Sequence, residues 1–589
     1  MSSAANPVVL DGSSLTLADL VRVARDPAVR VACDRAALER VARGRARIDA
    51  AVDKYRFEYN VWRSAPETAP KPALTYGVTT GFGLFKHIPI APEDLEETQR
   101  RLLLSHAAGV GDTTDVDDPA NYFPAEVVRA AILLRINAFL KGCSGVRVEL
   151  VETVLAMLNG GVVPLVPTRG SLGASGDLCP LSHCFATLLG EGRFYTVADA
   201  ASVRAEPRGI RPATDLAACL GRTPAKPTYK EGLALINGTN FSTAILALAA
   251  HDAAALADTA DTGAALALEA VCGRTRALDP RVHELRGHPG QIVSAARMRD
   301  LLAGSGLVDR AEEVQDVYSL RCAPQVHGAS RDALAYATAV VTRELNAATD
   351  NPLFFPDGDT DAFSAGNFHG QPIALAADTL AIAVAELASI SERRTQMLLD
   401  RHHNRHLPAN LVARRGVNSG YMIAQYTAAA LVSENKVLAH PASVDSIPSS
   451  ANSEDHVSMS LTAARKLRTI LGHAQAVLAI EMLVGAQAVE WRVGMDVDPN
   501  APAPVVNTAK AAAAEVVAFT AATDAIGHAR IAAKLGAGTR AAYEAVRRLV
   551  PTMVEDRPLD GDIRLIRRAV ESGEFNAAID AARSTARPA

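Results

Sequence analysis

The segment QPIALAADTLAIAVAELASISERRTQMLLD, residues 371–400, decides the fold class. From Pro372 onward its apolar residues recur at steps of three and four over about eight turns, at about 3.6 residues per turn of α-helix. This spacing predicts one long and largely buried helix. Similar patterns recur in three later segments separated by short proline- and glycine-containing breaks, at 419–440, 461–491 and 508–534. Together they predict a mainly α fold, a bundle of long antiparallel helices.

The composition of the 589-residue chain agrees with this fold class. Apolar residues make up 49% and aromatic residues 5%, which favours closely packed helices over the β-branched and aromatic strands of a sheet protein. A short helix is predicted over residues 15–25, where Thr16 precedes Asp19 by three positions as in a capping box. The first 220 residues or so are richer in glycine and proline and predict a smaller mixed region with short strands. We therefore expect an N-terminal domain over 1–222 and a long-helix domain over 223–589.

The charge pattern predicts small-molecule partners. The formal net charge is −5 and the pI about 6.3, without a long basic run, so the electrostatic footprint of nucleic-acid or anionic-membrane binding is missing. The N-terminus lacks a basic start followed by an apolar stretch, and we expect no apolar run to approach the roughly 20 residues of a membrane span. These features predict a cytoplasmic protein.

The cysteines predict neither a disulfide framework nor a zinc site. They are odd in number and have no CxxC spacing, and Cys179 and Cys184 lack the second ligand pair of a zinc site. We expect them to be reduced and to serve mostly as packing residues: Cys33, Cys143, Cys179, Cys184, Cys219, Cys272 and Cys322.

The segment GSLGASGDLCPLSH, residues 170–183, contains a tripeptide with unusual chemical potential. If the amide nitrogen of Gly176 attacks the carbonyl of Ala174 and water leaves, a five-membered imidazolone closes. Loss of the Ser175 hydroxyl then leaves an exocyclic methylene, an electrophile that no standard side chain provides. Glycine leaves the nitrogen unhindered and serine supplies the β-hydroxyl. By itself the tripeptide fits equally a glycine-rich turn before a helix.

The surrounding segments distinguish these two interpretations, because the chain resembles the histidine and aromatic amino-acid ammonia-lyase family, closest to its histidine lyases. The resemblance extends over more than four fifths of the chain. Besides residues 170–183 it rests on YGVTTGFG (76–83), LLLSHAAGVGD (102–112), INGTNFST (236–243), VQDVYSLRCAPQVHG (314–328), SAGNFHGQP (364–372), GVNSGYMIAQ (416–425) and SANSEDHVSM (450–459).

The resemblance implies a prosthetic group, 4-methylideneimidazol-5-one (MIO), formed autocatalytically from Ala174, Ser175 and Gly176, with no metal required. It also implies an ammonia-lyase/fumarase-like helical fold and a homotetramer whose active sites are each assembled from three subunits. In such a site the MIO lies near the positive N-terminal ends of several helices, which would sharpen its electrophilicity. Addition of the substrate amine to the MIO methylene makes ammonia a better leaving group.

The resemblance also implies roles for individual residues. Tyr76 corresponds to the base that takes the β-proton, which calls for a lowered pKa. Arg321 corresponds to the arginine that binds the substrate carboxylate, with Gln315 as a substrate-binding and Tyr318 as a catalytic neighbour. Outside the family, a tyrosine in a glycine-rich loop is more often simply hydrogen-bonded, and a lone arginine is usually solvated.

Two further residues are placed around the ring by the resemblance. Asn237 would offer its amide to the MIO carbonyl or to the substrate carboxylate, and Phe368 would pack near the ring. Without the family, they would be interpreted as a loop residue and a core residue.

Two positions indicate the substrate. Ser105-His106 matches the pair typical of histidine lyases, where tyrosine and phenylalanine lyases carry His-Leu and Phe-Leu. Glu454 lies where those enzymes tend to carry glutamine, and a carboxylate can accept a hydrogen bond from an imidazole N–H. The predicted reaction is elimination of ammonia from L-histidine to give trans-urocanate. The alternative interpretations are that His106 is a buried, hydrogen-bonded histidine and that Glu454 is an N-cap-like residue of a helix.

Some features depart from the histidine-lyase pattern: Asn240, Ala323, His327 and a longer stretch over 55–72, which could reshape the lid over the site. The last part of that stretch, RSAPETAPKP (63–72), is predicted to be a loop because of its prolines. The cluster RHHNRH (401–406) suggests a metal site if His402 and His406 share a helix face. Because no acidic third ligand is evident beside them, a solvated or interface loop is the stronger interpretation.

Three alternative functions compete with the predicted one. The same MIO site could support a tyrosine or phenylalanine ammonia-lyase, or a 2,3-aminomutase in which the amine adds back at the β-carbon. A helical scaffold that has lost the chemistry is opposed by the intact Ala174-Ser175-Gly176 with Tyr76 and Arg321. A fumarase- or argininosuccinate-lyase-type eliminase is opposed by the absence of a lysine from residues 446–459.

Overall fold

The computed structural model describes residues 6–198, 203–204, 207–358, 362–500 and 509–586. Its contacts divide the chain into two compact units. Unit 1 consists of residues 1–248, 338–378 and 441–465, and unit 2 of residues 249–337, 379–440 and 466–589. We predicted two domains that are each continuous in sequence, with a boundary at 222/223. The two units are discontinuous in sequence, so this boundary stays a prediction.

Unit 1 begins with the small strands that the sequence predicted. β1 (Val8–Leu10) pairs in parallel with β2 (Val31–Cys33), and α1 (Leu17–Arg25) lies between them in sequence. The Thr16 side chain accepts a hydrogen bond from the Asp19 backbone N–H, so Thr16 caps the start of α1, as the capping-box-like pattern predicted. A second sheet is antiparallel, in the order β3 (Val162–Pro164), β4 (Arg193–Thr196) and β5 (Arg211–Pro212).

Helices make up most of the rest of unit 1, and α4 forms its centre. All 15 residues of α4 are buried. Its buried Arg135 donates from Nη1 to two carbonyl oxygens, Asn237 O at 2.9 Å and Thr349 O at 3.0 Å, and burial lowers its pKa to about 10. The helices of this unit are α2 (Arg35–Ser64), α3 (Leu95–His106), α4 (Ala125–Phe139), α5 (Val148–Asn159), α6 (Leu178–Ala186), α7 (Leu216–Leu220) and α8 (Glu231–Ile236).

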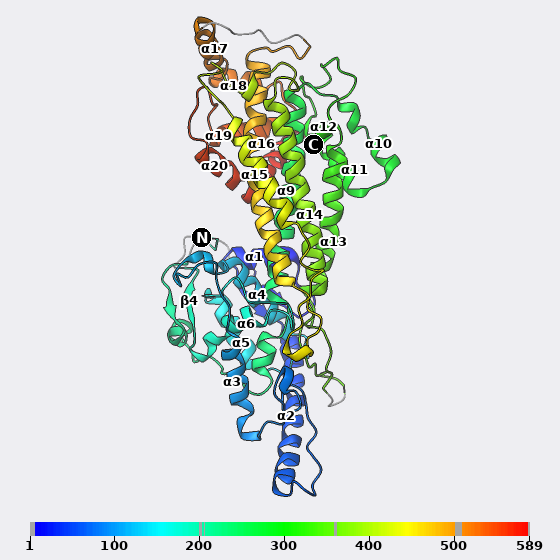
Figure 1. Ribbon diagram of the computed structural model, residues 1–589, viewed down its shortest axis with the longest axis vertical. Coiled ribbons are helices and arrows are strands. Elements are labelled where there is room, and N and C mark those ends of the chain that lie inside the picture. The colour runs from blue at the N-terminus through cyan, green and yellow to red at the C-terminus, as the bar shows by residue number, and fades with distance from the viewer. Residues whose placement is uncertain (1–5, 199–202, 205–206, 359–361, 501–508, 587–589) are drawn as a thin grey trace. The chain divides into compact units, whose positions relative to one another are not determined.

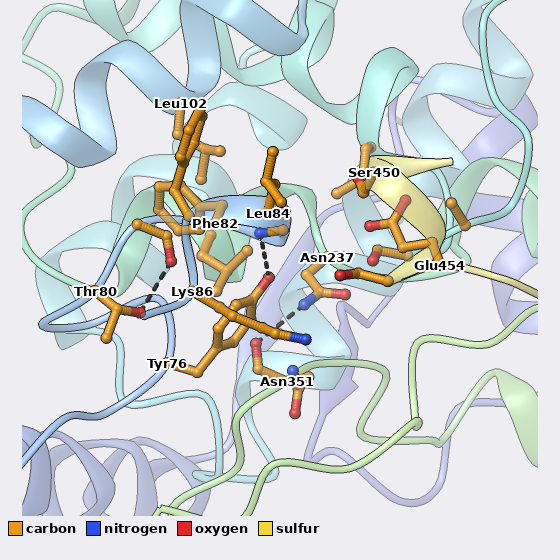
Figure 2. A pocket seen from close by; sticks show the side chains of 18 of the residues that line it. Tyr76, Thr80, Phe82, Leu84, Lys86, Leu102, Asn237, Asn351, Ser450 and Glu454 are labelled. Atoms are coloured by element: carbon orange, nitrogen blue, oxygen red, sulfur yellow. Dashed lines mark hydrogen bonds between the residues drawn. The ribbon is translucent and has the colours of Figure 1, made fainter. Parts of the chain in front are cut away.

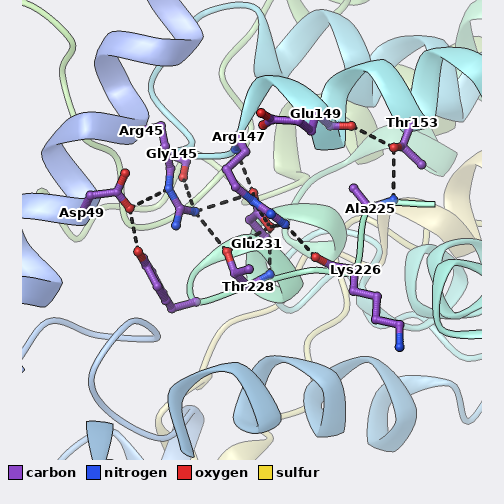
Figure 3. Close-up of polar contacts among 11 residues, drawn as sticks. Arg45, Asp49, Gly145, Arg147, Glu149, Thr153, Ala225, Lys226, Thr228 and Glu231 are labelled. Carbon is purple, nitrogen blue, oxygen red and sulfur yellow. Dashed lines mark hydrogen bonds and ion pairs between the residues drawn. The ribbon is translucent and has the colours of Figure 1, made fainter. Parts of the chain in front are cut away.

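A buried carboxylate fixes the start of α8, just before the Asn237 loop. Glu231 is fully buried and accepts hydrogen bonds from Arg147 N at 2.7 Å, Arg147 Nη2 at 2.8 Å and Thr228 N at 2.8 Å. Figure 3 shows Arg45 of α2 approaching the same carboxylate, with Nη1 3.6 Å from Oε1. The hydrogen bonds to Glu231 raise the pKa of Arg147. These charge-assisted contacts set where the chain enters the candidate site.

The long helices confirm the mainly α prediction. The segment 371–400 forms α14 (Gln371–Leu399), 419–440 forms α15 (Met422–Leu438) and 461–491 forms α16 (Ser460–Gly494). Two further long helices precede them, α9 (Asn240–Ala270) and α13 (Ala323–Glu344). Shorter helices of unit 2 are α10 (Pro280–Arg286), α11 (Pro289–Leu301) and α12 (Tyr318–Arg321).

Buried charges link four of these helices inside unit 2. Arg394 of α14 pairs with Glu481 of α16 and lies 3.2 Å, Nη1 to Nε2, from His327 of α13. His327 Nδ1 lies 2.7 Å from Asp261 Oδ1 of α9. The four helices therefore run alongside one another here (Figure 1), and His327, a departure from the family pattern, is part of their core.

Two of the long helices are more apolar than we expected from the sequence. By length and composition, α14 and α16 could each cross a membrane, so the expectation of no such run was wrong. However, 67% and 83% of their apolar windows are buried within the protein. That burial is typical of core helices, whose apolar residues face other helices on every side.

The predicted helix over 508–534 is wrong in its continuity. Within the described residues it is split into α17 (Ala509–Ala522) and α18 (Ala525–Ala532), and Thr508 lies outside them. Asp524 accepts a hydrogen bond from Gly527 N at 2.8 Å and so begins a new helix. Three helices follow, α19 (Ala537–Leu549), α20 (Asp560–Ser572) and α21 (Glu574–Ala586).

Glu269 near the end of α9 predicts a pH dependence of stability. The side chain is fully buried and accepts a hydrogen bond from Gly536 N at 2.7 Å, and burial raises its pKa to about 7. Because the folded state then binds this proton more tightly than the unfolded state, stability falls as pH rises from about 4.5 to about 7, by about 3 kcal/mol for this group. We expect Glu269→Gln to remove that loss, so that its melting temperature exceeds that of the wild type increasingly from pH 5 to pH 8. A constant difference across this range would contradict the prediction.

Candidate functional site

A cavity of about 1260 Å³ in unit 1 brings together most of the residues singled out in the sequence. Figure 2 shows it with Tyr76 and Thr80 on one side, Ser450 and Glu454 on the other, and Asn237 between them. The sequence candidates among its lining residues are Tyr76, His106, Ala174, Ser175, Asn237, Phe368 and Glu454.

The Ala174–Gly176 loop is held in a conformation that requires glycine. Gly173 and Gly176 have φ angles of +72° and +74°, in the left-handed region. A Cβ on Gly176 would lie 2.3 Å from the carbonyl carbon and oxygen of Gly238, so no other residue fits there. The Gly176 backbone also pairs with the backbones of Gly173 and Ala174, which folds the tripeptide back on itself.

Three helices begin beside this loop. α6 starts at Leu178, α9 at Asn240 and α16 at Ser460. Asp177 N donates to Gly238 O at 2.7 Å, and the Oγ atoms of Ser242 and Ser460 are 3.0 Å apart. The positive ends of their dipoles therefore lie near Ser175. This arrangement agrees with what the resemblance implied for an electrophile at this position.

Asp177 is a residue that sequence reasoning missed. It is fully buried and accepts hydrogen bonds from Ser242 N and Ser242 Oγ, both at 2.8 Å, and from Ser171 Oγ at 3.3 Å. Burial raises its pKa to about 6 despite the Ser242 bonds. Its place directly after Ala-Ser-Gly was the available signal. The carboxylate ties the loop to the first turn of α9.

Tyr76 does not have the lowered pKa that a base calls for. Burial raises the pKa of its phenol, the Gly83 N–H opposes that shift, and the negative charge of Glu454 adds to it. The Gly83 contact is long, 3.4 Å from N to the Tyr76 oxygen. In this chain alone the phenol is therefore protonated at neutral pH, because the effect of burial exceeds that of one weak donor.

Glu454 is positioned by its own loop. Its carboxylate accepts a hydrogen bond from Ser449 Oγ at 2.7 Å, and the backbones of the two residues bond in both directions. Between them Ser450, Ala451 and Asn452 all have left-handed φ angles, of 49°, 51° and 64°. Such backbone strain in non-glycine residues persists only where its surroundings enforce it, and it is concentrated at functional sites.

His106 ends α3 and lines the cavity in its neutral form. Burial lowers its pKa. Its Nδ1 lies 2.9 Å from Leu102 O, a contact that requires the proton on Nδ1. Nε2 is then an unprotonated acceptor. Ser105, the other half of the pair, donates from Oγ to the same Leu102 carbonyl at 3.2 Å.

The Asn237 side chain differs from the expectation. Its Nδ2 donates to Asn351 O at 3.0 Å, while its buried Oδ1 has no partner among the described residues. The unpartnered atom is therefore an acceptor, which suits an N–H donor better than the carbonyl or carboxylate we predicted. Asn351 and Lys86 also line the cavity and were not singled out in the sequence. Neither belongs to a motif whose chemistry stands out by itself.

Three predicted residues are not brought to the cavity. Gln315, Tyr318 and Arg321 belong to unit 2 and are absent from the cavity lining. Tyr318 is 71% exposed, and Arg321 Cζ lies 4.5 Å from the centroid of its ring. In a single chain the half-buried Arg321, the predicted carboxylate-binding group, therefore belongs to a different unit from the one that contains the cavity.

The other departures have structural roles. Residues 401–406 form a turn, so His402 and His406 do not share a helix face, and no group of three potential metal ligands occurs among the described residues. The first part of the 55–72 stretch extends α2 to Ser64, so the loop predicted over 63–72 begins two residues later than expected, and its proline-rich remainder is a loop. Asn240 Oδ1 accepts a hydrogen bond from Arg135 Nη1 at 3.4 Å.

Comparison with known proteins places these motifs in one family. The model of the aromatic amino acid lyases matches residues 15–515. The chain is 45% identical to a histidine ammonia-lyase of Caldanaerobacter subterraneus subsp. tengcongensis, over 96% of this chain and 97% of that protein. A histidine ammonia-lyase from Trypanosoma cruzi has a similar structure, with a TM-score of 0.78 at 36% identity, over 98% and 96% of the two chains.

A tyrosine aminomutase from Streptomyces globisporus is equally similar in structure, with a TM-score of 0.79 at 36% identity, over 98% of this chain and 99% of the other. Lyases and aminomutases thus share this helical fold. The family match covers most of the chain, and the relatives are matched over nearly their full length. The chain belongs to the aromatic amino acid lyase family.

Proposed function

We propose that this protein eliminates ammonia from L-histidine to give trans-urocanate, using an MIO group formed from Ala174, Ser175 and Gly176. The observation that carries the proposal is the cavity, which surrounds the Ala174–Ser175 loop with Tyr76, His106 and Glu454. The 45% identity to a histidine ammonia-lyase over nearly the full length supports the same reaction.

The residues present fit an MIO group. Gly176, which has no side chain and packs against Gly238, lies on a loop that is already folded back, so its amide nitrogen is unhindered. When formed, MIO supplies an electrophile that converts the substrate amine into a better leaving group. Asp177 and the three helix N-termini hold the loop in place.

His106 and Glu454 recognise the imidazole ring. The unprotonated Nε2 of His106 and the carboxylate of Glu454 are both hydrogen-bond acceptors in the cavity wall. An imidazole offers an N–H donor to these acceptors, whereas a phenyl ring offers none. A site built to hydrogen-bond its substrate in this way rejects an analogue that lacks the donor.

Tyr76 removes the β-proton, and Arg321 binds the carboxylate. Because Arg321 belongs to unit 2 and is absent from the cavity lining, we propose that other subunits of a homotetramer complete each site. A cation brought there, either Arg321 or the substrate ammonium, would lower the pKa of Tyr76 toward the range in which it can accept a proton. The enzyme acts on a free amino acid in the cytoplasm, without nucleic acid, membrane or metal.

The test offers purified protein L-histidine, L-tyrosine and L-phenylalanine separately and follows the conjugated acid by absorbance. Urocanate from histidine alone is expected. Aminomutation is the second candidate, favoured by the similarity to the tyrosine aminomutase of Streptomyces globisporus. Chromatography for β-amino acids in the same reactions decides between them, since a β-amino acid product would replace the proposed function.

Replacing His106 with leucine tests the basis of selectivity. We expect kcat/KM for L-histidine to fall about 10- to 100-fold, because one acceptor for the ring is lost at a cost of about 1–3 kcal/mol. Activity on L-phenylalanine should rise or stay constant, since leucine removes an unpaired polar group. An equal fall for both substrates would contradict a role for His106 in ring recognition.

A further inference from the structure

The turn at residues 401–406, which follows α14, contains a buried arginine that no step of the proposed reaction uses. The side chain of Arg405 is 5% exposed and faces the segment that carries Gln315, Tyr318 and Arg321. Its Nε donates to Glu313 Oε2 at 2.8 Å, its Nη2 to Asp316 Oδ1 at 2.7 Å and its Nη1 to Val271 O at 2.6 Å. All of these groups belong to unit 2.

Asp316 is the residue through which this contact reaches the predicted carboxylate-binding group. Its side chain is 1% exposed, and its second oxygen accepts a hydrogen bond from Arg274 N at 2.7 Å. Its backbone carbonyl accepts from Arg321 Nε at 2.9 Å. Arg405 therefore holds Asp316 by the side chain, and Asp316 holds Arg321 by the backbone.

Asp316 anchors a segment whose neighbouring side chains are exposed. Val314, Gln315, Val317 and Tyr318 are exposed, and Asp316 is the buried residue among them. With Nε committed to Asp316, Arg321 keeps Nη1 and Nη2, which have no hydrogen-bond partner among the described residues. These two atoms are the pair that a guanidinium offers end-on to a carboxylate.

We infer that Arg405 is a positioning residue, which fixes the Gln315–Arg321 segment so that Arg321 presents its terminal nitrogens to the substrate carboxylate. The inference rests on the proposed function, because it assumes that Arg321 binds this group. It also gives a role to the cluster at 401–406, whose histidines suggested a metal site. We assign the role of this cluster to Arg405.

The test compares Arg405→Gln with Arg401→Gln, a matched control at an exposed arginine of the same turn. In Arg405→Gln we expect KM for L-histidine to rise about tenfold while kcat changes less than about twofold, since ground-state binding of the carboxylate is what weakens. The inhibition constant of urocanate, which has a carboxylate, should rise to a similar degree. That of histamine, which lacks one, should not change. Equal weakening of both inhibitors, or of neither, would overturn the inference.

Hydrogen exchange separates failure of the inference from failure of the proposed function, because it needs no turnover. Backbone amides of residues 312–321 should exchange faster in Arg405→Gln than in the wild type or in Arg401→Gln, with α14 unchanged. Unchanged exchange in 312–321 would overturn the inference whatever the substrate proves to be. If Arg405→Gln fails to fold because Asp316 is left as an unpaired buried charge, the double variant Arg405→Gln/Asp316→Asn removes both charges. The same inhibitor pattern is expected from it, and a wild-type pattern would overturn the inference.

Discussion

Replacing Ser175 with alanine is expected to lower kcat for the elimination by a factor on the order of 10⁴ or more, as when the covalent catalyst of an enzyme is removed. Without the Ser175 hydroxyl no water can be lost to form the exocyclic methylene. The remaining cavity would still bind the amino acid. It could not turn the amine into a leaving group.

The fold should survive this change. The Ser175 side chain is half-buried, and no hydrogen bond of its hydroxyl is found among the described residues, so alanine at this position leaves no polar group unpaired. The measurements are urocanate release, the mass of the intact protein and the melting temperature. The wild type should lack the mass of two water molecules relative to its sequence, and the variant should not. Activity within tenfold of the wild type would show that the electrophile is not made from Ser175.

Replacing Tyr76 with phenylalanine should give the second largest effect, a fall in kcat of about 10² to 10⁴, which is the usual contribution of a positioned general base. KM should change little, because the phenol is predicted to act on the β-proton and not to bind the ground state. The variant should fold normally, since the hydroxyl accepts only the long contact from Gly83 N at 3.4 Å. Retained mass loss in this variant would separate a missing base from a missing MIO.

The raised pKa of Tyr76 also predicts a pH profile. A base acts only when deprotonated, and burial holds the pKa of this phenol above its ordinary value of 10.0. The kcat/KM of the wild type reports the free enzyme. It should rise with pH through the alkaline range, about tenfold per pH unit, when the cation that lowers the Tyr76 pKa arrives with the substrate as its ammonium; a rise that ends near neutral pH would assign that role to Arg321 of another subunit. The neutral His106, whose pKa is lowered, adds no loss in that range. The residual activity of Tyr76→Phe should lack this slope, and an unchanged slope would assign it to another group.

The long helices were predictable from the sequence, because their apolar residues repeat at helical spacing. The segments that became α14, α15 and α16 were found in this way, and their bounds differ from the prediction by a few residues. The break between α17 and α18 was missed because the alanine-rich pattern continues through it. Only the Asp524 cap, a side-chain contact to Gly527 N, ends one helix and begins the next.

The candidate site was predictable where chemistry is confined to a motif. Ala174 and Ser175 stand in a tripeptide with distinctive chemistry, and the resemblance of the surrounding segments to a known family singled out this tripeptide and Tyr76. Asp177 and Arg405 were not predictable, because their partners Ser242 and Asp316 lie 65 and 89 residues away and only the folded chain brings them together. The raised pKa of Tyr76 was not predictable either, because it results from burial, and burial is a property of the folded chain.

The loop that carries Glu454 bears on how such enzymes could change substrates over evolutionary time. Paired backbone hydrogen bonds between residues 449 and 454 close this loop across its three left-handed residues, and the Glu454 side chain adds one hydrogen bond, which it accepts from Ser449 Oγ. A single-nucleotide change at this codon could therefore exchange the ring-recognising group while the scaffold that presents it stays intact. A mutation at this position can then change the substrate preference without destabilising the fold.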